Sequence, residues 1–165
     1  MYLNCHSFHS LRYGTISLDE LVLQAKVYNI TSLALTDINT ITGIYDFAKA
    51  CKKEGIKPIA GMEFRDDDNR LLYITLAKQR SGIAEICRLL TARNCDEIAL
   101  PLTAPAFQQV ITIYPTSNVP QQLQKNEYIG IRPDQLNILI RSEWKQRMDK
   151  LVILQPVTVS GKTEH

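Results

Sequence analysis

The sequence predicts an α/β fold with a mainly parallel sheet, either open or closed into a barrel. Short apolar runs of the kind that form buried strands alternate with amphipathic segments of helical period. A new strand begins about every 20 to 25 residues, which is the spacing of β/α units. The 165 residues, 45% of them apolar, suffice to bury one core. In either version of the fold, ligands collect at the carboxyl ends of the strands.

The first third of the chain supplies the clearest elements. A short strand at residues 3–6 runs into a polar turn. Residues 17–20, Ser-Leu-Asp-Glu, have the spacing of a capping box and predict the start of a helix. Residues 32–36 form an apolar run typical of a buried strand. Apolar spacing over residues 41–51 predicts a second helix, which ends at Gly55 in the position that favours glycine.

The rest of the chain continues the alternation. We expect strands at residues 56–61, 71–77, 110–114, 128–131 and 151–154, and helices at 82–90 and from Pro133 through Leu136, Leu139 and Ile140. The stretch 94–107 is expected to be a loop with a short helical turn. Asp66, Asp67 and Asp68 indicate a solvated hairpin turn rather than a cation site, because repelling carboxylates need water. Trp144 either packs a helix onto the sheet or contacts nucleic acid.

Composition sets limits on class and location. The net charge of +2 implies neither nucleic acid nor a membrane as a partner. No leader or membrane-spanning run is found, so a cytoplasmic protein without a membrane partner is expected. The four scattered cysteines are expected to be reduced thiols. We expect one domain over residues 1–155, with 156–165 as a C-terminal extension cut from a longer chain.

Polar side chains at three predicted strand ends suggest a site. His6, Asp37 and Glu63 each follow one of the first three strands, and His9 can join them from the turn. One histidine and two carboxylates suffice for a metal if they converge. Each has an alternative role: Asp37 as a cap, Glu63 as a solvated loop carboxylate, and His6 as a satisfied polar group. Asn4, two residues before His6, is a poor ligand for a catalytic transition metal.

Three stretches resemble a known family. They read Asn-Cys-His-Ser-Phe-His-Ser-Leu-Arg-Tyr-Gly at 4–14, Leu-Thr-Asp-Ile at 35–38 and Gly-Ile-Lys-Pro-Ile-Ala-Gly-Met-Glu at 55–63. This arrangement resembles a polymerase and histidinol phosphatase (PHP) domain, and more narrowly the N-terminal PHP domain of bacterial DNA polymerase III alpha subunits. The resemblance implies a distorted (β/α)7 barrel, here truncated at its C-terminal end, with a metal cluster at the carboxyl ends of its strands.

The resemblance also implies that the metal site is degenerate. The family's His-x-His pair matches Asn4 and His6, and its later Asp, His and His ligands match Tyr13, Ile38 and Leu72. Glu63 retains the family's carboxylate. Two retained ligands are too few for a cluster, because each metal needs about three protein ligands. No catalytic residue, metal or other cofactor is therefore expected.

Two functions follow as expectations. The first is a catalytically inactive scaffold or interaction domain of a DNA-directed DNA polymerase, a nucleotidyltransferase that acts in DNA replication. Its partners would be the rest of that chain, replisome subunits and, through the parent chain, DNA. The alternative is an active phosphoesterase or 3'-5' proofreading exonuclease that binds zinc or manganese through His6, Glu63, Asp37 and His9.

Overall fold

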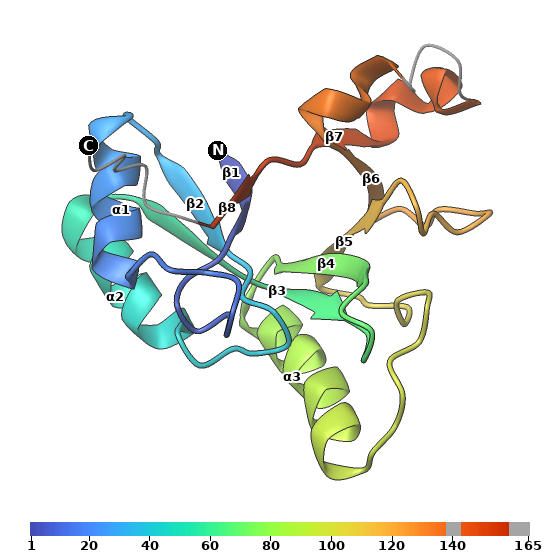
Figure 1. Cartoon of the computed structure of the whole chain (residues 1–165), viewed down its shortest axis with the longest axis horizontal. Helices are drawn as coiled ribbons and strands as arrows, with labels where there is room; N and C mark the ends of the chain where they lie inside the picture. The colour runs from blue at the N-terminus through green and yellow to red at the C-terminus, as the bar shows by residue number, and fades with distance from the viewer. Residues whose placement is uncertain (138–142, 159–165) are drawn as a thin grey trace.

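The computed structural model describes residues 1–137 and 143–158, and it shows a curled, eight-stranded sheet with helices on its outside (Figure 1). The strands are β1 (Tyr2–Cys5), β2 (Ser32–Leu35), β3 (Lys57–Arg65), β4 (Leu71–Ala77), β5 (Val110–Pro115), β6 (Glu127–Ile131), β7 (Leu151–Ile153) and β8 (Pro156–Val157). The helices are α1 (Leu18–Val27), α2 (Ile44–Glu54) and α3 (Arg80–Cys95), with 3-10 segments η1 (Pro133–Gln135) and η2 (Glu143–Lys150). The predicted α/β class is confirmed.

The sheet is mainly parallel, as predicted. Its strand order is β7-β6-β5-β4-β3-β2-β1-β8, and only β4 runs antiparallel to its neighbours. The two edge strands of the sheet, β7 and β8, are consecutive in the chain, so the curl of the sheet brings its two edges close together. Leu154 and Gln155 alone separate β7, which pairs with β6, from β8, which pairs with β1. One segment, residues 151–158, therefore bridges the two edges of the sheet.

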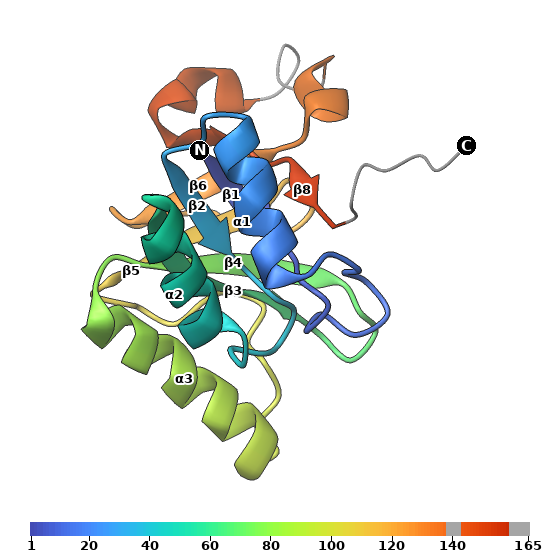
Figure 2. The same cartoon turned by 90° about the vertical axis from the view of Figure 1, so that its left-hand side faces the viewer.

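Three apolar clusters fill the fold. The first packs α1 and α2 onto β1 and β2, and the second packs α3 onto β3, β4 and β5. Figure 2 shows α1 and α2 side by side, with α3 crossing below them. The third cluster, which includes Ala34, Ile74 and Ile113, lies on the face of the sheet opposite the helices. This inner face is the one that positions the candidate site.

Local sequence signals explain the element ends. The Ser17 hydroxyl accepts a hydrogen bond from the backbone N–H of Glu20 at 3.2 Å, as the capping box predicts. Gly55 ends α2 with φ +74°, a left-handed conformation that glycine adopts without strain. The predicted hairpin turn after β3 is confirmed: Asp66 and Arg70 pair across it, and Asn69 takes φ +63°. The helix start at Ser17, the helix end at Gly55 and the turn at Asn69 therefore lie where the local sequence patterns predicted them.

Several predicted boundaries are wrong. β3 continues through Arg65, so Glu63 lies inside the strand and not beyond its end. α3 extends from Arg80 to Cys95, and the loop after it contains no helical turn between residues 96 and 109. β8 was not predicted, and the expected boundary at residue 155 falls between β7 and β8. Leu139 and Ile140, expected to continue a helix, lie outside the described residues. In the part of the chain that the structure describes, no helix is long and apolar enough to cross a membrane.

Candidate functional site

His6 and Glu63 meet on the inner face of the curled sheet. Glu63 lies opposite Ile74 of β4, a member of the inner cluster, and this register turns its carboxylate toward the inside. His6 follows β1, and its backbone N–H donates to the Val157 carbonyl at 2.8 Å. Nε2 of His6 and Oε2 of Glu63 are 2.9 Å apart, and both side chains are almost fully buried. These two predicted residues are therefore in contact, although Glu63 lies within β3 and not past its end.

Arg65 completes this pair with a positive charge. It lies two residues after Glu63 on the same face of β3, and its Nε and Nη2 atoms are 2.6 Å and 2.5 Å from Oε1 of Glu63. The guanidinium carbon stands 4.3 Å from the centre of the Tyr13 ring, and Nη1 donates to Oδ1 of Asn69 at 3.2 Å. Tyr13 also packs edge-on against His6, with ring centres 4.9 Å apart. The chain therefore supplies its own cation beside Glu63.

Burial and pairing act in opposite directions on Glu63. Burial alone would raise the pKa of its carboxyl group, but the hydrogen bond with His6 and the attraction of His6 and Arg65 outweigh burial and lower the pKa. Burial would likewise lower the pKa of Arg65, but the adjacent Glu63 carboxylate and Tyr13 together outweigh burial and raise it. Both groups consequently remain charged near neutral pH.

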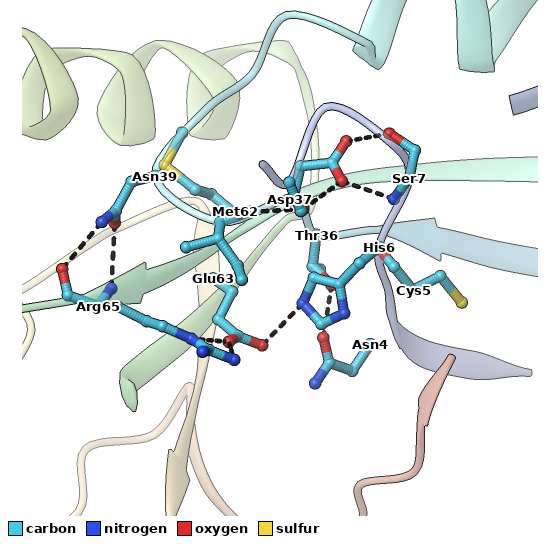
Figure 3. A network of polar contacts seen from close by, with 12 residues as sticks. Asn4, Cys5, His6, Ser7, Thr36, Asp37, Asn39, Met62, Glu63 and Arg65 are labelled. Carbon is cyan, nitrogen blue, oxygen red and sulfur yellow. Dashed lines mark hydrogen bonds and ion pairs between the residues drawn. The ribbon is translucent and has the colours of Figure 1, made fainter. Parts of the chain in front are cut away.

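Asp37 is a second buried carboxylate, and its hydrogen-bond partners are Ser7 and Ser10 instead of His6 and Arg65. Its Oδ1 accepts from the Ser7 backbone N–H at 2.7 Å and from the Ser10 hydroxyl at 2.6 Å. Its Oδ2 accepts from the Ser7 hydroxyl at 2.8 Å. Ser10 in turn accepts from the Ile38 backbone N–H at 3.1 Å. Asp37 thus acts as a cap, as one alternative proposed, but for the loop after β1 instead of the loop and helix that follow it (Figure 3).

The loop after β2 aligns the charged residues of β3. Ile38 forms a parallel bridge with Glu63, and the Asn39 N–H donates to the Glu63 carbonyl at 2.9 Å. The Asn39 side chain bonds both the N–H and the carbonyl of Arg65, at 3.0 Å and 2.9 Å. Asn39 reaches this position with φ +49°, a conformation that Asn tolerates better than most residues. Hydrogen bonds from Asn39, which lies in the loop after β2, thus fix the backbone of Glu63 and Arg65.

The other predicted residues differ in how near they lie to this pair: Tyr13 packs against His6 and Ile38 bridges Glu63, whereas Leu72 and His9 make contacts elsewhere. Asn4 accepts from the Thr36 hydroxyl through Oδ1 at 2.8 Å, and Ile38 is half-buried. Leu72 packs in the cluster beneath α3. His9 packs against Gly43, where an added Cβ would come within 2.7 Å of its ring. The sequence reasoning missed Arg65; the Glu-x-Arg spacing in a strand extended past Gly61 was the available signal.

The residues present do not fit a metal cluster in this arrangement. The oxygens of Glu63 contact His6 and Arg65, and those of Asp37 contact Ser7 and Ser10. A divalent ion at Glu63 would have to displace or lie beside the Arg65 guanidinium. Among the residues that the structure describes, no three His, Cys, Asp or Glu side chains converge as metal ligands would.

Comparison with known proteins gives consistent matches. The PHP domain family model matches residues 3–127. DNA polymerase III subunit alpha from Aquifex aeolicus (strain VF5) is 46% identical over 63 residues, which covers 38% of this chain and 5% of that protein. The same subunit from Bacillus subtilis (strain 168) is 36% identical over 94 residues, covering 54% and 8%. That from Staphylococcus aureus (strain Mu50 / ATCC 700699) is 32% identical over 118 residues, covering 68% and 11%.

The chain therefore spans only a small part, 5% to 11%, of the length of these curated relatives. A solved structure of an amidohydrolase from Chromobacterium violaceum, with bound SO4 and no metal, superposes with a TM-score of 0.61. It is 12% identical and covers 97% of this chain and 88% of its own. At that identity the likeness concerns the fold alone.

Proposed function

This chain belongs to the PHP domain family, and from that premise we propose that it is the N-terminal PHP domain of a DNA polymerase III alpha subunit. In this proposal its metal site is degenerate and hydrolyses no phosphate ester. The domain acts as a structural or interaction scaffold, while nucleotidyl transfer occurs elsewhere in the parent chain. DNA is reached through that chain, replisome subunits are further partners, and the location is the cytoplasm.

The observation that carries the proposal is the contact between Arg65 and Glu63. Metal-assisted hydrolysis needs a cation with an open coordination position, where it can lower the pKa of a bound water. A guanidinium neutralises a carboxylate equally well as a charge, but it offers no such position and activates no water. Arg65 therefore neutralises the charge of Glu63 as a metal ion would, but it cannot activate a water molecule for hydrolysis.

The alternative, a metal-dependent phosphoesterase or 3'-5' exonuclease, requires His6, Glu63, Asp37 and His9 to share one zinc or manganese site. The hydrogen bonds of Asp37 to Ser7 and Ser10, and the packing of His9 on Gly43, speak against that set.

The metal content of the purified chain tests the loss of hydrolysis. The chain is dialysed against zinc or manganese, then against metal-free buffer, and its metal is measured by mass spectrometry. Fewer than about 0.1 ion per chain supports the proposal, and two or more retained ions overturn it. Hydrolysis of a phosphomonoester and of 3'-labelled single-stranded DNA is assayed in parallel in the wild-type chain and in His6→Ala. Chelator-sensitive activity that His6→Ala abolishes would favour the alternative.

The polymerase role is tested separately. The chain is mixed with a DNA polymerase III alpha subunit that lacks its own PHP domain, and the mixture is analysed by size-exclusion chromatography and primer extension. We expect the two to comigrate and primer extension to increase. Separate migration at micromolar concentrations would contradict the assignment to a polymerase, whatever the metal content.

A further inference from the structure

A groove of about 220 Å³ lies between α2 and α3, beside the amino end of β3 and the carboxyl end of β4. Figure 2 shows the two helices next to each other on this side of the sheet. The apolar side chains that line the groove include Ile44, Phe47, Ala48, Pro58, Ala77 and Ile83. A space of this size accommodates one or two apolar side chains of another molecule.

The rim of the groove is positively charged. Lys78 and Arg80 line it, and Lys52 lies one helical turn after Ala48 on α2. All three are exposed, and none forms an ion pair with any residue in the described part of the chain. α3 begins at Arg80 without an acidic residue in its first turn, so its positive end adds to these charges.

The nearby carboxylates face elsewhere. Asp46 and Glu54 of α2 line depressions on the side of the helix that faces α1, and Glu54 pairs there with Lys26. Glu85 of α3 accepts hydrogen bonds from the backbone N–H groups of Gln108 and Gln109, at 2.8 Å and 3.1 Å. The side of α2 that faces α1 thus carries Lys49 and Lys53 together with the two carboxylates, whereas the lining of the groove includes Lys78 and Arg80 and no carboxylate.

We propose that this groove binds an acidic segment of a partner protein, which places an apolar side chain between α2 and α3 and its carboxylates on Lys52, Lys78 and Arg80. Charge complementarity selects an anionic partner, and the apolar lining selects one that also carries a hydrophobic anchor. Nucleic acid fits less well, because it would require cations that follow successive phosphates instead of surrounding a hollow. The inference rests on the interaction role proposed above and specifies the chemistry of its partner.

The probe is a fluorescein-labelled peptide in which Asp and Glu runs flank a central Leu-Phe pair, titrated with the full chain and followed by anisotropy. The test variant is Lys78→Glu with Arg80→Glu. The matched control is Lys49→Glu with Lys53→Glu, which reverses two exposed charges on the α1 side of α2. We expect the test variant to weaken binding by at least about tenfold and the control by less than about twofold. Circular dichroism and thermal melts show that both variants are folded.

Two further peptides separate the contributions. Replacing Asp and Glu by Asn and Gln, or Leu-Phe by Ser-Ser, should each weaken binding by about tenfold or more. Equal loss in the test and control variants, or equal binding of the Asn and Gln peptide, would overturn the proposal. Single-stranded DNA that competes at lower concentration than the unlabelled peptide would also overturn it, in favour of nucleic acid. None of these outcomes depends on the metal content, so the proposal for the groove and the proposal of a degenerate metal site can each be rejected without the other.

Discussion

Asp37, in the loop after β2, and Glu63, in the neighbouring strand β3, are both almost fully buried carboxylates, yet different partners satisfy them. Asp37 accepts hydrogen bonds from the neutral N–H and hydroxyl groups of Ser7 and Ser10. Glu63 is held by Arg65 and His6. Neutral donors fix a loop without changing the net charge of the interior, whereas Arg65 cancels the charge of Glu63. The comparison shows two ways to satisfy a buried carboxylate in one region of the fold, with neutral donors at Asp37 and with an adjacent cation at Glu63.

Removing the cation should have the largest effect. Arg65→Met leaves Glu63 buried with His6 as its remaining side-chain partner among the described residues, and breaking a buried pair in this way costs about 3 to 5 kcal/mol. We expect the free energy of unfolding, measured by urea denaturation, to fall by that amount. Arg70→Met is the control, because Arg70 pairs with Asp68 where both are exposed, and it should cost less than about 1 kcal/mol. Equal losses of unfolding free energy in the two variants would show that the buried Arg65–Glu63 pair stabilises the fold no more than an exposed pair does.

Removing the charge of Asp37 should cost less. Asp37→Asn keeps one carbonyl oxygen but forces an NH₂ group toward donors, so about 2 kcal/mol of unfolding free energy should be lost. The loss should change little with salt, because the partners of Asp37 are neutral. The exposed Asp46→Asn serves as the control and should stay within about 0.5 kcal/mol of wild type. A loss as large as that of Arg65→Met would remove the distinction between the two carboxylates.

Acid should weaken the Glu63 contacts selectively. The pKa of Glu63 is lowered by folding, so the folded chain binds this proton less readily than the unfolded chain. The stabilising contribution is therefore present above the unfolded pKa of about 4.3 and is lost as pH falls through the lower folded pKa. The difference in unfolding free energy between wild type and Glu63→Gln should shrink below about pH 4.5. A difference that stays constant down to pH 3 would contradict this assignment.

The smallest expected effect is on metal binding by Ile38→His. Ile38 matches a family ligand and is half-buried beside Glu63, but Arg65 still pairs with Glu63 in this variant. We expect the zinc content after dialysis to remain below about 0.1 ion per chain, as in wild type. Combining Ile38→His with Arg65→Met tests whether the guanidinium is the obstacle. A tight zinc site in Ile38→His alone would contradict the degenerate site.

Features that depend on residues close together in the sequence could be predicted, whereas features that depend on distant residues could not. The cap at Ser17 and the stop at Gly55 were predictable, because each depends on residues within one helical turn. The end of β3 was missed, although apolar Met62 and Phe64 alternate with polar Glu63 and Arg65 in the pattern of a strand with one buried polar face. β8 gives no such signal, since a two-residue strand that begins with proline exists only through its pairing with β1.

The candidate site shows the same limit. The expectation that ligands collect at strand ends put His6 and Glu63 in one group, and the two are in contact even though Glu63 lies within β3 and not past its end. It placed Asp37 and His9 in the same group, although Ser7 and Ser10 bind Asp37 and Gly43 packs against His9. Such contacts depend on loop conformations, which short-range patterns do not determine. Arg65 was missed for the same reason as the end of its strand.

The segment 151–158, which links the two edges of the sheet, has a consequence for the order of folding during translation. Of the strands described, β1 leaves the ribosome first and β8, which covers its second edge, leaves last. Until then the His6 N–H lacks its partner, the Val157 carbonyl. The nascent chain must therefore carry an open strand edge beside His6 until residues 156–157 have been made, a stage at which such edges invite aggregation.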